Sequence, residues 1–173
     1  MSGSLRLIKK TTTSANADIV SLSDCFVTDY SVYKVIFNFE DDSGVSNNTF
    51  FRLLDSSGNP LAGNDYDIAT LILRNNASFG KVRVQGTTFW NYGGFVLNSN
   101  TQGFGLEMDI YNPFSSSSYT FANLTSVNSA SADMGNKNIY CYKQTTSTRG
   151  LQFSAALGNL QNLKASVYGL ASN

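Results

Sequence analysis

The fold class is decided by the stretch Tyr30-Ser31-Val32-Tyr33-Lys34-Val35-Ile36-Phe37-Asn38-Phe39. In an extended chain its two faces would carry Val32, Lys34, Ile36 and Asn38 on one side, and Tyr33, Val35, Phe37 and Phe39 on the other. A repeat of two residues predicts a β-strand. Because both faces carry apolar residues, we expect one face to pack on a core and the other to be partly covered.

Short apolar or alternating runs of the same kind recur on both sides of this stretch, separated by Gly, Asn, Ser and Asp. The runs that predict strands are residues 5–9, 17–22, 30–39, 49–54, 81–85, 94–97, 106–111, 119–124, 138–142, 151–154 and 164–168. About ten short strands at near-regular spacing are typical of an antiparallel β-sandwich or jelly roll. No linker divides the chain, so we expect a single domain over residues 1–173.

One segment, residues 66–74, is ambiguous between helix and strand. Ile68, Leu71 and Ile72 fall at helical spacing, and Asp65 or Asp67 could cap a helix. The same segment could equally be a buried strand. The predicted fold class is therefore all-β, with at most one short helix.

Composition and charge exclude several classes of function. The 173 residues hold 12 basic and 12 acidic side chains and no histidine. Without histidine there is no Ser-His-Asp or Cys-His catalysis and no histidine metal ligand, so an enzyme would need carboxylates, lysine, tyrosine or cysteine. A net charge of zero gives no electrostatic attraction to nucleic acid or to an anionic membrane. No apolar run is long enough to insert into a membrane. We therefore expect neither nucleic acid nor a membrane as a partner.

The two cysteines, Cys25 and Cys141, lie far apart in strand-like surroundings. They are interpreted as buried thiols that pack as small apolar side chains. Whether they form a disulfide is not decided by the sequence, because the bond requires the two Cα atoms to lie within about 7 Å.

Carboxylates come close together in three places. Asp65 and Asp67, and residues 40–42, could contribute to a calcium site, but neither shows calcium-loop spacing, and solvated turns are the favoured interpretation. Glu107 and Asp109 share one face of a predicted strand and should point to solvent, although such a pair could serve glycoside hydrolysis. We predict no catalytic residue, no metal and no cofactor.

The densest aromatic cluster lies at residues 89–95. Its candidate binding residues are Phe89, Trp90, Tyr92 and Phe95, beside two glycines that would let another chain or ligand approach. Aromatic rings next to asparagine are common where proteins stack sugars or anchor interfaces. The favoured interpretation of Trp90 is a core residue packed between sheets, and an interface or glycan role is the alternative.

The C-terminal third resembles a group of small virion proteins of tailed bacteriophages, common in marine and cyanobacterial phages. The stretches that carry the resemblance are Tyr142-Lys143-Gln144-Thr145-Thr146-Ser147, Gly150-Leu151-Gln152-Phe153, Gly158-Asn159-Leu160 and Lys164-Ala165-Ser166-Val167-Tyr168-Gly169-Leu170, with weaker likeness at residues 51–67 and 109–114. The last strand of that group typically ends in Val/Leu-Tyr-Gly-Leu/Ile. The likeness extends loosely over residues 30–170.

The resemblance implies a β-sandwich on a phage particle, without enzymatic activity and forming a homotrimer. We expect a virion structural protein, assembled in the host cytoplasm, that belongs to a tail fibre or baseplate. Its partners would be copies of itself, other virion proteins and a host surface glycan. The main alternative is a capsid decoration or cement protein, and a carbohydrate-binding domain or a glycan-active enzyme are further alternatives.

Overall fold

The computed structural model describes residues 4–13, 17–41, 49–76, 78–91, 104–127, 133–156 and 159–171. Within these ranges the regular elements are all β-strands, which confirms the predicted all-β class. They are β1 (Ser4–Thr12), β2 (Ile19–Leu22), β3 (Val32–Asp41), β4 (Thr49–Leu54), β5 (Tyr66–Arg74), β6 (Phe79–Thr87), β7 (Trp90–Asn91), β8 (Phe104–Tyr111), β9 (Thr120–Val127), β10 (Asp133–Tyr142), β11 (Gly150–Ala155) and β12 (Leu160–Ala171).

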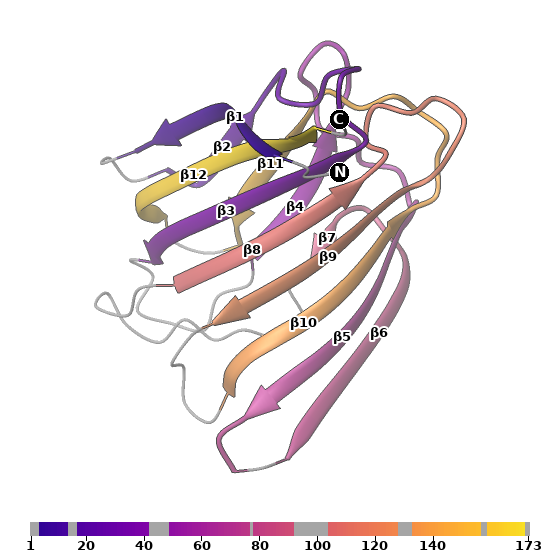
Figure 1. Ribbon diagram of the computed structural model, residues 1–173. Helices are drawn as coiled ribbons and strands as arrows, with labels where there is room; N and C mark the ends of the chain where they lie inside the picture. The colour runs from indigo at the N-terminus through magenta and orange to yellow at the C-terminus, as the bar shows by residue number, and fades with distance from the viewer. Residues whose placement is uncertain are drawn as a thin grey trace.

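The strands form two layered sheets, the larger of which crosses Figure 1 from β1 to β6. Its order is β1-β12-β3-β8-β9-β10-β5-β6, and the smaller sheet has the order β2-β11-β4-β7. All neighbouring strands are antiparallel. The outcome is the predicted sandwich, with one face of the eight-stranded sheet turned inward and the other outward.

The core lies between the sheets and is rich in phenylalanine. Phe153 of β11 contacts Phe37 and Phe39 of β3, with ring centroids 5.1 Å and 5.0 Å apart. It also stacks on Phe51 of the neighbouring β4 at 4.9 Å. The alternation that predicted β3 therefore identifies which of its side chains enter the core.

The ambiguous segment, residues 66–74, is strand β5 and not a helix. A helix would gather Ile68, Leu71 and Ile72 on one side, whereas the strand buries Ile68, Thr70 and Ile72 and leaves Leu71 exposed. Pairing with β10 and β6 on both sides overrides the weak helical spacing. Within the described residues no helix could cross a membrane.

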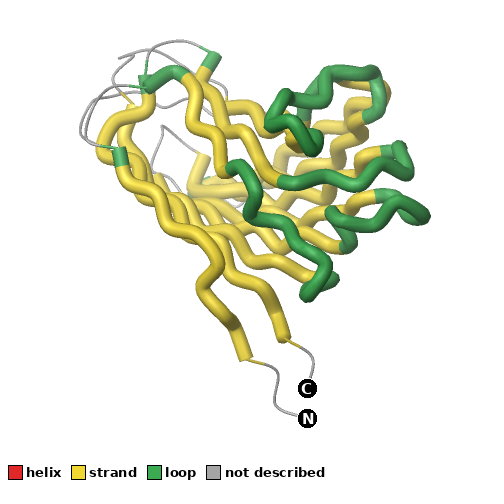
Figure 2. Tube along the Cα trace, turned by 90° about the horizontal axis from the view of Figure 1, so that it is seen from above, coloured by secondary structure: helices red, strands yellow, loops and turns green. Residues whose placement is uncertain are grey.

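The two long edges of the larger sheet carry only basic charges. Edge strand β1 contains Arg6, Lys9 and Lys10, and edge strand β6 contains Lys81 and Arg83, with no acidic residue in either. Lysine and arginine on an edge oppose pairing with the edge of another copy. Figure 2 shows the start of β1 beside the end of β12 at one corner of the molecule. There Ser4, the first residue of β1, pairs with Ala171, the last residue of β12.

The predicted strands within the described residues coincide with observed ones, and most observed strands are longer. The predicted strand at residues 94–97 lies outside the described residues. Strand β7, Trp90–Asn91, was not predicted because two residues carry no period.

Candidate functional site

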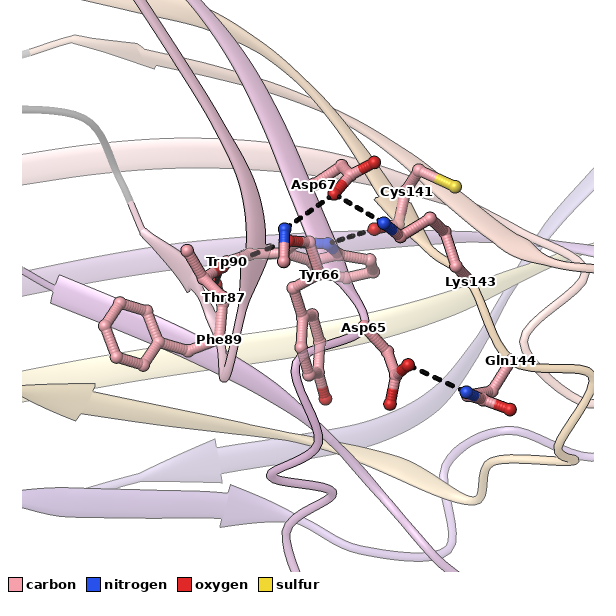
Figure 3. A network of polar contacts seen from close by, with 10 residues as sticks. Asp65, Tyr66, Asp67, Thr87, Phe89, Trp90, Cys141, Lys143 and Gln144 are labelled. Carbon is pink, nitrogen blue, oxygen red and sulfur yellow. Dashed lines mark hydrogen bonds and ion pairs between the residues drawn. The ribbon is translucent and has the colours of Figure 1, made fainter.

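Trp90 is a core residue and not an exposed binding platform. Its exposed fraction is 0%, and its ring stacks on Tyr140 with centroids 5.2 Å apart and meets Tyr66 edge-on at 5.5 Å. Its indole Nε1 donates a hydrogen bond to the carbonyl oxygen of Cys141 at 3.2 Å (Figure 3). Of the two interpretations of Trp90, the structure agrees with the favoured one, a core residue, and rules out the interface or glycan role, because the side chain has no exposed surface.

Phe89 is partly buried beside the smaller sheet. Its ring lies 4.3 Å from that of Phe50, and the guanidinium carbon of Arg52 lies 5.5 Å from its centroid. These contacts hold Phe89 against β4 and leave only part of the ring accessible. Tyr92 and Phe95, the other two candidates, lie outside the described residues.

Asp65 and Asp67 each bind a partner within the chain (Figure 3). Asp65 accepts a hydrogen bond from Gln144 Nε2 at 2.7 Å, and Asp67 lies 3.0 Å from Lys143 Nζ. The N–H of Gly86 donates to Asp67 at 2.9 Å. The two carboxylates therefore tie β5 to β6 and to the end of β10, and among the described residues no group of acidic or cysteine side chains is arranged to hold a metal ion.

Replacing Asp67 with asparagine should flatten the loss of stability in acid. Partial desolvation acts to raise the pKa of Asp67, but the Gly86 N–H and the Lys143 and Arg83 charges outweigh it and hold the pKa below its usual range. A carboxylate with a depressed folded pKa stabilises the fold above its unfolded pKa of about 3.9 and loses that contribution as the pH falls through the folded value.

Urea denaturation of Asp67→Asn between about pH 5 and pH 2 should therefore show a shallower decline than the wild type, with a cost of at most about 1 kcal/mol at neutral pH. Asp18→Asn, which removes an exposed carboxylate beside β2, is the control for loss of one surface charge. Parallel declines for Asp67→Asn and the wild type would show that the ion pair does not contribute.

Glu107 and Asp109 point outward from β8, as the alternation predicted. Lys34 of the adjacent β3 forms ion pairs with both, hydrogen-bonding Glu107 and lying 3.0 Å from Asp109 Oδ1. Partial burial acts to lower the pKa of Lys34, but the hydrogen bonds to the two carboxylates outweigh it and raise that pKa. The three side chains form a charged cluster on the outer face of the larger sheet.

The two thiols have different surroundings. Cys25 is fully buried, and burial raises the pKa of its thiol to about 12. Cys141 is only partly buried, on the outward side of β10. Both are free cysteines, so the interpretation as buried thiols holds for Cys25 but not for Cys141.

The outer face of the larger sheet carries a continuous line of apolar side chains, one from each strand, which we call the apolar band. From β6 to β1 its members are Phe79, Leu71, Ile139, Phe121, Tyr111, Val32, Leu170 and Leu5. Six of the eight are exposed, with Phe79 at 69% and Ile139 at 63%, while Tyr111 and Val32 are partly buried.

Strand register makes the band continuous. Tyr111 pairs directly with both Phe121 and Val32, and Leu5 pairs with Leu170. Most of the other steps are diagonal; Ile139, for example, lies opposite Asn123, two residues from Phe121. Diagonal neighbours on a sheet face remain within reach of aromatic and long apolar side chains.

The sequence alone does not reveal the apolar band. Each member is a single apolar residue on the solvent face of its own strand, which is unremarkable by itself. Only the pairing of distant strands gathers them into one row, and contiguous exposed apolar patches commonly mark interaction sites.

Comparison with known proteins shows fold-level likeness only. No family model matches the chain, and no curated protein is similar to it. Among solved structures, the alginate lyase Aly36B mutant K143A/M171A with alginate trisaccharide has a TM-score of 0.33 at 13% identity, covering 94% of this chain and 81% of its own. The PL-14 alginate lyase from Aplysia kurodai has a TM-score of 0.35 at 6% identity, covering 85% and 71%. The CBM2 module of the evolved Dit of Lactobacillus casei BL23 phage J-1 has a TM-score of 0.29 at 6% identity, covering 94% of this chain and 76% of its own.

These structures correct the prediction that the chain has no enzymatic activity. Alginate lyases are among them, and that prediction is withdrawn. The absence of histidine excluded histidine chemistry alone and left carboxylate, lysine and tyrosine chemistry open. At such low TM-scores and identities the likeness assigns no reaction and no active-site residue to this chain.

Proposed function

We propose that the protein is a structural component of a tailed-bacteriophage virion, in a tail fibre or baseplate, that assembles as a homotrimer and with other virion proteins. The observation that carries the proposal is the apolar band across the outer face of the larger sheet. The reason for proposing a phage particle is the resemblance of the C-terminal stretches to virion proteins of tailed bacteriophages.

The distribution of charge favours assembly through the face of the sheet. Basic side chains occupy both long edges, and like charges would repel when two such edges approach. The band carries no charge and is bordered by Lys81 and Lys137, which lie opposite Leu71 on either side. An apolar strip with a charged rim is the common arrangement of a protein interface.

Membership of a virion is testable by microscopy. Immunogold labelling of purified particles, with an antibody against this chain, should place gold on the tail fibre or baseplate. Label on the head would support the alternative of a capsid decoration protein. Unlabelled particles in a lysate whose soluble fraction contains the protein would contradict both.

A further inference from the structure

A groove runs across the outer face of the larger sheet, separate from the apolar band. Its floor is a row of residues in direct register, Val127, Gly105, Asn38, Lys164 and Thr12, one from each of β9, β8, β3, β12 and β1. Adjacent strands lie about 4.8 Å apart, so the row spans about 19 Å. We call it the cross-strand groove.

Near the β8 and β9 end of the groove, Gly105 contributes no side chain to the floor. A hollow of about 380 Å³ lies there, bordered by Ile36, Glu107 and Thr125. A second hollow of about 430 Å³ shares Asn38, Gly105 and Val127 with the first and continues to Glu40 and Asn162. Each has the volume of a small-molecule site.

A third hollow, of about 350 Å³, extends the groove to Thr12 at the end of β1 and to Thr13, which follows it. It shares Glu40, Asn162 and Lys164 with the second. An irregularity in β12 forms this end, because pairing with β3 shifts between Gln161 and Lys164 and Asn162 has a φ of 48°. Asn162 Nδ2 donates to Glu40 Oε2 at 2.7 Å, which holds the wall in place.

We propose that the cross-strand groove binds an uncharged oligosaccharide in extended form. Its described lining offers amides, carboxylates and hydroxyls, and each can meet the hydroxyl groups of a sugar, which both donate and accept hydrogen bonds. The polar lining residues are Asn38, Asn162, Glu40, Glu107, Thr12, Thr13, Thr125 and Lys164. The three joined hollows fit a chain and not a compact ligand.

The charges around the groove give no excess of positive charge for an anionic ligand. Glu107 is paired with Lys34, and Glu40 lines the same hollows as Lys164. A uronate, sulfate or phosphate would lose hydration there without a surplus cation to compensate. The inference goes beyond assembly and does not depend on it, because the groove and the apolar band use different rows of the sheet.

The test is an NMR titration of the isolated protein with neutral gluco-, manno- and galacto-hexasaccharides, and with a hexamannuronate as the charged probe. The side-chain amide signals of Asn38 and Asn162 should shift with at least one neutral sugar, at a Kd of about 1 mM or tighter. The amide of Asn123, on the same face but outside the groove, should not shift, and hexamannuronate should bind more weakly.

The variant Gly105→Leu places a side chain in the first two hollows, both of which Gly105 lines. A Cβ at Gly105 would lie 3.4 Å from Asn38 Oδ1 and 3.5 Å from Val127 Cγ2, so the backbone accepts a side chain. Affinity should fall about tenfold or more in Gly105→Leu and in Asn38→Ala, and remain unchanged in Asn123→Ala.

Three results would overturn the proposal, and none of them bears on the apolar band. They are no shift with any neutral sugar, tighter binding of hexamannuronate, and undiminished affinity in both groove variants.

Discussion

Replacing Trp90 with alanine is expected to lower the free energy of unfolding by about 3–5 kcal/mol, the cost typical of removing a buried tryptophan. The substitution leaves a cavity against Tyr140 and Tyr66 and removes the hydrogen bond from the indole to the Cys141 carbonyl. Urea denaturation followed by circular dichroism measures the change.

Two further variants separate packing from polarity. Trp90→Phe keeps most of the apolar contact but loses the hydrogen bond, and its cost should lie between that of Trp90→Ala and zero. Tyr119→Ala removes an aromatic ring that is 43% exposed and lies outside the apolar band, and it should cost under about 0.5 kcal/mol. A Trp90→Ala protein as stable as the wild type would show that the ring is not part of the core.

Replacing Ile139 with lysine is expected to weaken self-association without affecting the fold. Ile139 lies near the middle of the apolar band and is 63% exposed in the free chain, so lysine is tolerated there when the chain is unassembled. In an assembled interface its charge would be desolvated among apolar side chains. The cost should reach about 2 kcal/mol, or about thirtyfold in the dissociation constant, as for an interface hot spot.

The matched control is Thr125→Lys, which adds the same charge to the same sheet face but removes no apolar band member. Thr125 is exposed on β9, four residues from Phe121. Sedimentation velocity over a range of concentrations should show weaker association for Ile139→Lys alone. Equal weakening by the two variants would indicate a general charge effect and count against the band.

The strand pattern could be predicted because apolar and polar residues alternate along a strand that has one buried and one exposed face. Residues 30–39 identified β3, and the outward orientation of Glu107 and Asp109 followed from the apolar residues between them. Local spacing failed at residues 66–74, where pairing with neighbouring strands decided between helix and sheet. Trp90 also needed the structure, since an aromatic cluster near glycines fits a core as well as a binding site.

The two surfaces could not be predicted for a different reason. The apolar band and the cross-strand groove are rows that run across strands, and their members are separated by up to about the whole chain length. Gly105 lies just before the predicted strand at residues 106–111, and only the strand register places it between Asn38 and Val127. Strand order and register hold this information, and no motif in the sequence encodes either one.

The claim that the apolar band is an assembly surface is tested most directly by the molar mass of the wild-type protein in solution. Multi-angle light scattering at increasing concentration should give a species of three times the 18.8 kDa chain mass. A constant mass of 18.8 kDa up to the highest soluble concentration would contradict it.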